Sequence, residues 1–124
     1  MRLLLDTHAF LWWRVDEARL SSEVRGKIST AEVVFVSLAS AWEIAIKASV
    51  GKLHIPGTIE QRLVDSHFDP LPIRFRHVEC VASLPLHHRD PFDRMLIAQC
   101  QVEELMLVTS DRRLRPYDVS FLWI

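Results

Sequence analysis

The chain has 124 residues, of which 49% are hydrophobic and 25% are charged, and its formal net charge is −1. These values predict one folded domain, residues 1–124, with a buried core, and they exclude a disordered chain or a strongly basic protein that coats nucleic acid. No hydrophobic run approaches the roughly 20 residues of a membrane span. The hydrophobic start of the chain ends at Asp6, too early for a signal peptide. We therefore expect a cytoplasmic protein without a membrane segment.

Short hydrophobic segments alternate with helical patterns along the chain. In chain order the patterns predict strands at 2–5 and 33–37, helices at 39–47, 58–67, 75–84 and 92–103, and strands at 105–109 and 119–123. The last helix has the clearest beginning, with Asp90 as N-cap and Pro91 in the first turn. Hydrophobic strands that alternate with helices predict an α/β domain with a mainly parallel sheet.

Four acidic residues are expected at one edge of this sheet. Asp6 directly follows the first strand and Asp111 lies two residues after the third, so both are at carboxyl ends of strands. Glu43 and Asp93 lie in the first turns of helices that begin at the same edge. Ligands of open α/β sheets bind at this edge. A hard divalent cation such as Mg²⁺ relieves the repulsion between grouped carboxylates, and the resulting site suits phosphodiester hydrolysis.

Each acidic residue also has a structural interpretation when it is taken alone. Asp6 can cap a helix or a loop, Asp111 can begin a turn, and Glu43 stands four residues before a lysine, the spacing of a helix ion pair. Asp90 and Asp93 stand three residues apart, and we assign Asp90 to capping and Asp93 to the metal. The shared edge of the sheet supports the metal site better than any single position does.

The remaining polar candidates are histidines and arginines. His87 and His88 lie in a loop, where surface or substrate contacts are expected, and His8 follows the first strand closely. No His-x₃-His pair or cysteine partner accompanies them, so zinc ligation is not expected and no histidine is placed in the catalytic set. Arg94 and Arg112 are the arginines that we expect to engage phosphates.

Five short motifs follow one another along nearly the whole chain: Leu5-Asp6-Thr7-His8, Ser37-x-x-Ser40-x-x-Glu43, Gly51-Lys52-Leu53, His88-Arg89-Asp90-Pro91-Phe92-Asp93-Arg94 and Val108-Thr109-Ser110-Asp111. In this order they resemble the PIN-domain ribonucleases, and most closely the VapC-type toxins of bacterial toxin–antitoxin pairs. Any one motif is a weak signal, whereas the ordered set is specific.

The resemblance implies a PIN-like three-layer α/β/α domain with a mainly parallel central sheet. It places the acidic quartet of the family on Asp6, Glu43, Asp93 and Asp111, as catalytic residues that bind Mg²⁺ or Mn²⁺. It also implies that Thr109 is an accompanying hydroxyl that orients a metal-bound water or a phosphate oxygen. The implied activity is endonucleolytic RNA cleavage by a toxin, with homodimerisation and with inhibition by a small antitoxin protein.

A surplus of hydrophobic residues near the N-terminal helices has two interpretations. Core packing accounts for part of it, and by analogy with the family the rest forms a dimer face or a groove for an antitoxin segment. The residues concerned are Leu11, Trp12, Trp13, Trp42, Ile46 and Leu53.

Two alternatives to the ribonuclease stay open. A catalytically inert PIN-fold protein-binding module would keep the fold and hold only a protein partner, although the complete acidic set argues against it. A metal-dependent phosphatase of similar architecture usually has Asp-x-Asp after the first strand, where this chain has Asp6-Thr7-His8.

Overall fold

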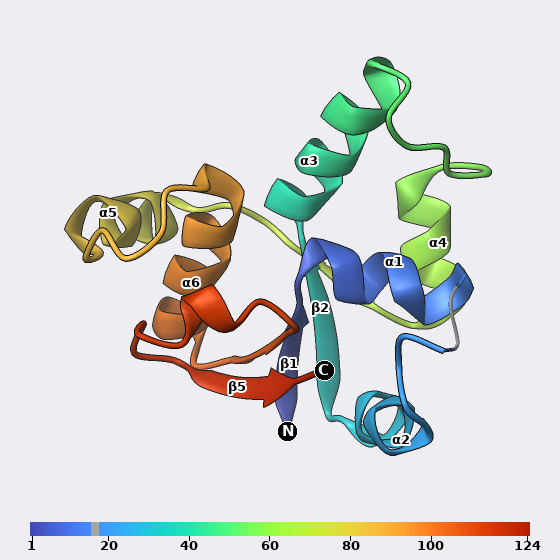
Figure 1. The fold of residues 1–124 in the computed structure, drawn as a ribbon, viewed down its shortest axis with the longest axis horizontal. Helices are drawn as coiled ribbons and strands as arrows, with labels where there is room; N and C mark the ends of the chain where they lie inside the picture. Colours follow the sequence, from blue (N-terminus) through green and yellow to red (C-terminus); the bar gives the residue numbers. More distant parts are fainter. Residues whose placement is uncertain (16–17) are drawn as a thin grey trace.

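The strands form one parallel sheet in a computed structural model that describes residues 1–15 and 18–124 (Figure 1). Within these residues the sheet has five strands in the order β3-β2-β1-β4-β5, and each pairing of neighbours is parallel. The strands are β1 (Arg2–Leu5), β2 (Val33–Ser37), β3 (Asp69–Leu71), β4 (Met106–Thr109) and β5 (Ser120–Trp123). The predicted parallel sheet is therefore confirmed.

Helices cover both faces of this sheet. They are α1 (Thr7–Val15), α2 (Ser22–Thr30), α3 (Leu38–Ser49), α4 (Ile59–Ser66), α5 (Phe75–Ser83), α6 (Pro91–Glu103) and the short 3₁₀ helix η1 (Arg112–Leu114). Figure 1 shows α5 and α6 on one side of the strands and α1, α2 and α4 on the other. The three-layer α/β/α arrangement is confirmed, and the eight predicted elements agree with the observed ones to within two residues at each end. The elements α1, α2, β3 and η1 were not predicted.

The central strand shows why both faces need helices. Leu3, Leu4 and Leu5 are consecutive and have no solvent exposure. Because side chains of a strand alternate between its faces, Leu4 packs into the core under α5 and α6, whereas Leu3 and Leu5 pack into the core under α1, α2 and α4. Burial of each leucine stabilises the fold by about 2 kcal/mol. Among the described helices, none is long and hydrophobic enough to cross a membrane.

Three helices begin at the edge where the strands end, and each has a side-chain cap. Asp6 Oδ1 accepts the amide of Ala9 at 2.8 Å at the start of α1. Ser37 Oγ accepts the amide of Ala39 at 3.0 Å at the start of α3. Asp90 Oδ1 accepts the amides of Phe92 and Asp93 at 2.8 and 3.1 Å at the start of α6, so the predicted capping role of Asp90 is confirmed. The same edge therefore collects the beginnings of three helices.

Candidate metal centre

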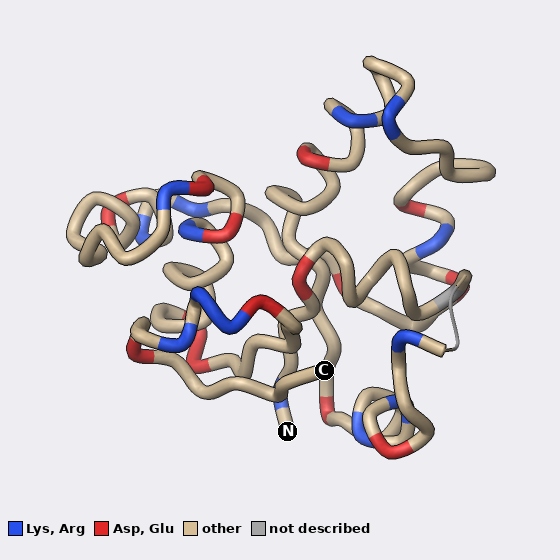
Figure 2. Tube along the Cα trace, viewed as in Figure 1, with Lys and Arg blue, Asp and Glu red and all other residues tan. Residues whose placement is uncertain are grey.

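The acidic residues lie where β1, β4 and α6 meet. Strands β1 and β4 are neighbours, and the backbone amide of Asp6 donates to the carbonyl of Val108 at 3.0 Å. Figure 2 shows acidic segments directly after β1, after β4 and at the beginning of α6, gathered around one end of the sheet. This is the edge at which the parallel topology predicts a ligand site.

Asp6 is the most enclosed carboxylate of the candidate centre, with 6% of its surface exposed. Its Oδ2 accepts the hydroxyl hydrogen of Thr109 at 2.6 Å, and Thr109 is fully buried. Burial raises the pKa of Asp6 above its usual value, and the hydrogen bonds from Thr109 and Ala9 oppose that rise. Asp6 thus serves as a helix cap and also presents a carboxylate at the edge of the sheet.

Thr109 connects two of the acidic residues. The same hydroxyl that donates to Asp6 accepts the backbone amide of Asp111 at 3.1 Å. Its one hydrogen is therefore used on a carboxylate, whereas the family resemblance implied a contact with a metal-bound water or a phosphate oxygen. In this structure Thr109 fixes the positions of Asp6 and Asp111 relative to each other.

Asp93 lies in the first turn of α6 and faces a histidine. The ring Nε2 of His88 is 2.9 Å from Asp93 Oδ2, and 24% of the Asp93 side chain is exposed. Burial, followed by the charge of Asp90, raises the pKa of Asp93 to about 6, although the hydrogen bond with His88 acts in the opposite direction. Asp93 is therefore a carboxylate whose negative charge is poorly compensated by the protein.

Asp111 follows β4 and forms a two-pronged ion pair with Arg113. Arg113 Nε donates to Oδ1 at 2.9 Å and Nη2 donates to Oδ2 at 2.7 Å. The hydrogen bond from the Arg113 side chain lowers the pKa of Asp111 below its usual value. Because 73% of the Arg113 side chain is exposed, the pair contributes little to folding stability. Asp111 also caps η1, which agrees with its interpretation as the start of a turn.

Three side chains have potential ligand atoms close enough together to bind one cation. One ligand atom each from His88, Asp93 and Asp111 lies within 4.8 Å of the others. Asp6 lies near this group. The charge of Asp6 contributes to the raised pKa of Asp93, and the charge of Asp111 contributes to the raised pKa of Asp6. Carboxylate oxygens are the donors that Mg²⁺ and Mn²⁺ prefer, and a divalent cation would offset the charge repulsion that is evident in Asp6 and Asp93. The residues present therefore fit such an ion.

Glu43 is positioned differently from the other three acidic residues. Its Oε1 accepts the hydroxyl hydrogen of Thr7 at 2.7 Å, which connects it to the residue after Asp6. Its Oε2 pairs with Lys47 at 3.0 Å, the helix ion pair that the four-residue spacing indicates. The structure thus joins Asp6 to Asp111 through Thr109 and brings Asp93 close to Asp111, and it places Glu43 on helix α3.

The arginines that were expected to contact phosphates have other partners. Arg94 Nη2 donates to the carbonyl of Val81 at 3.2 Å, and Nη1 donates to the carbonyl of Pro85 at 2.9 Å and to the hydroxyl of Tyr117 at 3.1 Å. The guanidinium of Arg94 thus holds the segment between α5 and α6, and its contact with phosphates stays a prediction. Arg112 lies over the ring of Trp123, 4.4 Å from its centroid, and its contact with phosphates stays a prediction.

His88 is the residue of this group that the sequence interpretation left out. Tyr117 accepts the amides of His87 and His88 at 3.2 and 3.0 Å, so the loop before α6 is fastened to a residue that is 3% exposed. The loop turns the His88 ring towards the first turn of α6. The available signal was the position of His88 two residues before the Asp90 cap. His8, in contrast, is exposed and lies against Trp12, with 5.6 Å between ring centroids.

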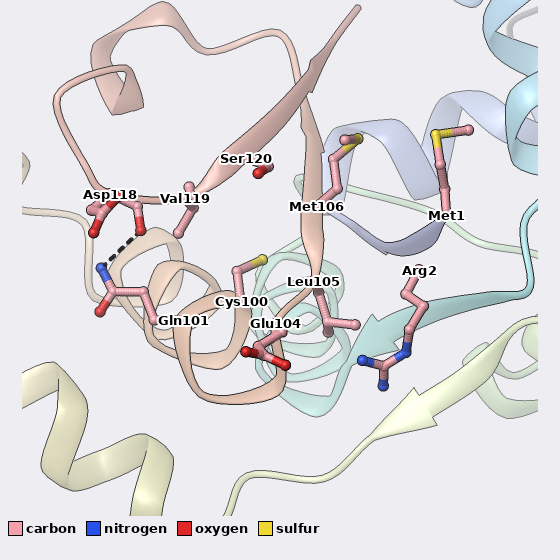
Figure 3. Close-up of a pocket in the computed structure, with 10 residues that line it drawn as sticks. All are labelled: Met1, Arg2, Cys100, Gln101, Glu104, Leu105, Met106, Asp118, Val119 and Ser120. Atoms are coloured by element: carbon pink, nitrogen blue, oxygen red, sulfur yellow. Dashed lines mark hydrogen bonds between the residues drawn. The ribbon is translucent and has the colours of Figure 1, made fainter.

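A pocket of about 560 Å³ lies at the opposite edge of the sheet (Figure 3). Met1, Arg2 and Met106 line it at the beginnings of β1 and β4. Gln101 and Asp118 also line the pocket, and the side-chain amide of Gln101 donates to the backbone carbonyl of Asp118 at 3.3 Å. This hollow is therefore separate from the carboxylates, which stand where the same strands end.

A parallel five-stranded sheet with carboxylates at the ends of its central strands defines the class to which this protein belongs. The chain matches the PIN domain over residues 3–119, and it belongs to the PIN-domain family. It is also similar to a curated protein, ribonuclease VapC22 of Mycobacterium tuberculosis, with 30% identity over 118 residues. The match covers 93% of this chain and 91% of that protein.

Solved structures confirm the fold. The chain is similar to a chain of VapBC2 from Rickettsia felis, bound to a DNA fragment from its promoter, with a TM-score of 0.75 and 12% identity over 98% of both chains. It is similar to a chain of FitAcB from Neisseria gonorrhoeae, with a TM-score of 0.69 and 18% identity over 97% of this chain and 96% of the other. A toxin–antitoxin complex from Klebsiella pneumoniae gives a TM-score of 0.64 at 17% identity, over 97% of this chain and 95% of that one.

Proposed function

We propose that this protein is a metal-dependent endoribonuclease, a hydrolase of RNA phosphodiester bonds, and that it is the toxin of a type II toxin–antitoxin pair. The observation that carries the proposal is that the buried hydroxyl of Thr109 joins Asp6 to Asp111, while a ligand atom of Asp93 lies within 4.8 Å of one of Asp111. The family membership and the similarity to a ribonuclease over almost the whole chain support the same activity.

Asp6, Asp93 and Asp111 would hold Mg²⁺ or Mn²⁺, with Glu43 contributing from α3. The ion supplies the polarisation of a phosphate oxygen and the activation of a water molecule. The protein contributes rigid placement, because Thr109 joins Asp6 to Asp111 and the Asp90 cap fixes the first turn of α6. Placing the reacting groups in this way lowers the entropic part of the activation barrier.

Positive charge lies next to the carboxylates. Arg112 and Arg113 lie in η1 and Arg115 directly follows it, and all three are exposed; Figure 2 shows this basic segment beside the acidic one after β4. Guanidinium groups are well suited to contact the phosphate oxygens of a substrate that binds at the carboxylates. The arginines thus compensate locally for a chain whose net charge is −1.

The partner surface that we propose lies on α3. Leu38, Trp42, Ile46 and Val50 are spaced by four residues and are 45%, 60%, 42% and 63% exposed. An exposed hydrophobic stripe of this kind is typical of a surface that binds another chain. This surface fits an antitoxin segment or a second copy of the toxin, which are the two partners that the family resemblance implies. We propose that the protein acts in the cytoplasm as a homodimer. By contrast Leu11, Trp13 and Leu53 pack against the core.

The test compares two aspartate-to-asparagine variants in an RNA cleavage assay. Asp93→Asn should abolish cleavage, whereas Asp118→Asn changes an exposed residue at the opposite edge of the sheet and should leave it intact. Removal of divalent ions with a chelator should stop cleavage by the unchanged protein, and Mn²⁺ or Mg²⁺ should restore it. A fully active Asp93→Asn variant, or cleavage that resists the chelator, would overturn the proposal. A wild-type protein that binds Mn²⁺ without cutting RNA would favour the inert binding module.

A further inference from the structure

The candidate centre contains a nitrogen donor besides its carboxylates. His88 Nε2 lies in the same group of atoms as the oxygens of Asp93 and Asp111, all within 4.8 Å of one another. Only 11% of the His88 side chain is exposed, so the ring is enclosed by the protein. A surface histidine without a local role would instead extend into solvent.

The backbone around His88 fixes the ring in this position. The His88 amide donates to the Tyr117 hydroxyl at 3.0 Å, and Arg94 Nη1 donates to the His88 carbonyl at 3.5 Å. The neighbouring His87 ring packs against the Tyr117 ring, with 5.0 Å between centroids. The backbone on both sides of His88 is therefore held by side chains from other parts of the chain. These contacts hold the backbone from which the His88 ring extends towards Asp93.

The distance between the two donors suits a shared ion. His88 Nε2 and Asp93 Oδ2 are 2.9 Å apart. In octahedral coordination with ligand bonds of about 2.1 Å, adjacent ligand atoms stand about 3 Å apart. An ion in contact with both atoms therefore needs little movement of either side chain. Asp111 supplies a further oxygen within 4.8 Å of these two atoms.

We propose that His88 Nε2 is a ligand of the metal ion in this site and that it makes the site prefer Mn²⁺ to Mg²⁺; this inference rests on the function proposed above. Mg²⁺ takes oxygen ligands, whereas imidazole suits transition metals. Mn²⁺ also suits carboxylates, which form the rest of the donor set. A mixed set of one nitrogen and several oxygens therefore favours Mn²⁺, while an all-oxygen set would discriminate less between the two ions.

The experiment measures binding of Mn²⁺ and Mg²⁺ to the full chain by calorimetry, together with pulsed electron paramagnetic resonance of the bound Mn²⁺. The unchanged protein should show ¹⁴N coupling from a coordinated imidazole. In His88→Gln the coupling should disappear, and the affinity for Mn²⁺ should fall by more than the roughly 10- to 100-fold that loss of an outer contact costs. Mg²⁺ affinity should change much less, and its retention shows that the carboxylates are still in place. His54→Gln, a change at an exposed loop histidine, should behave as the unchanged protein.

The outcomes separate this inference from the proposed function. If bound Mn²⁺ requires Asp93 but shows no ¹⁴N coupling, His88 only orients Asp93, and the inference fails while the ribonuclease proposal stands. Equal losses of Mn²⁺ and Mg²⁺ affinity in His88→Gln would also overturn it, because that pattern reports a structural role. If Asp93→Asn leaves Mn²⁺ binding unchanged, the proposed metal site itself is wrong.

Discussion

Replacing Thr109 with valine removes one hydroxyl from the centre of the site while nearly preserving the size of the side chain. The hydroxyl donates to Asp6 across 2.6 Å and is fully buried. A hydrogen bond to a charged group contributes about 1.5–3 kcal/mol to stability. The variant also leaves the Asp111 amide without its acceptor. We therefore expect Thr109→Val to lower the free energy of unfolding of the metal-free protein by about 2–3 kcal/mol near neutral pH.

The pH dependence of this loss identifies its cause. Burial already raises the folded-state pKa of Asp6 above 3.8, and loss of the Thr109 hydrogen bond raises it further. A carboxyl group with a raised folded pKa destabilises the fold most at pH values above that pKa. The penalty shrinks as the pH falls below the folded pKa and is gone below the unfolded value of 3.8. The difference between variant and wild type should thus be largest at neutral pH. In acid it should shrink to the value of a neutral hydrogen bond, about 1 kcal/mol.

Urea denaturation in the presence of a chelator, at about pH 7.5 and about pH 4.5, measures both quantities. Thr30→Val is the matched control, because the Thr30 hydroxyl donates to the carbonyl of Gly26 on an exposed helix end. This control should change stability by less than about 0.5 kcal/mol. If Thr109→Val costs no more than Thr30→Val, or costs the same at both pH values, the account of Asp6 is refuted.

Three further predictions concern Asp93, the loop of His88 and Asp111. Burial raises the pKa of Asp93 to about 6, so metal-free wild type should gain stability as the pH falls through 6. Asp93→Asn should remove that part of the gain in urea denaturation, and an unchanged pH profile would contradict it. Tyr117→Phe leaves the amide of His88 without its acceptor and should cost about 1–3 kcal/mol in the same assay; a loss below about 0.5 kcal/mol would count against the described loop. Arg113→Ala should raise the pKa of Asp111 towards 3.8 in a carboxyl NMR titration, with stability changed by less than about 0.5 kcal/mol. An Asp111 pKa that does not move would show that the ion pair is absent in solution.

The sequence predicted the fold where hydrophobic periodicity and capping signals coincide. The strand 33–37 is continuous and β-branched, and α6 begins at an Asp-Pro pair, so both were recognised. Strand β3 was missed because it is three residues long and contains Asp69 and Pro70, which are uncommon in strands. It lies at the edge of the sheet, where a proline without an amide hydrogen is tolerated. Only the assembled sheet explains its presence.

The site was predicted as far as topology determines it. Parallel strands end at one edge, so the neighbourhood of Asp6 and Asp111 followed from the order of elements. The partners of each side chain did not follow from it. The proximity of His88 to Asp93 depends on a loop held by Tyr117, which is 29 residues away in sequence. Pattern analysis of neighbouring residues carries no information about such a contact.

The position of β1 in the sheet has a consequence for biosynthesis. The first strand to be made is the central one, and it needs β2 on one side and β4 on the other. Asp6 meets Thr109 across 103 residues of sequence. Contacts of such long range form slowly, since a large loop must close first. A growing chain therefore cannot complete the centre until the ribosome has passed Thr109, and shorter nascent chains of this protein lack the arrangement that would cut RNA.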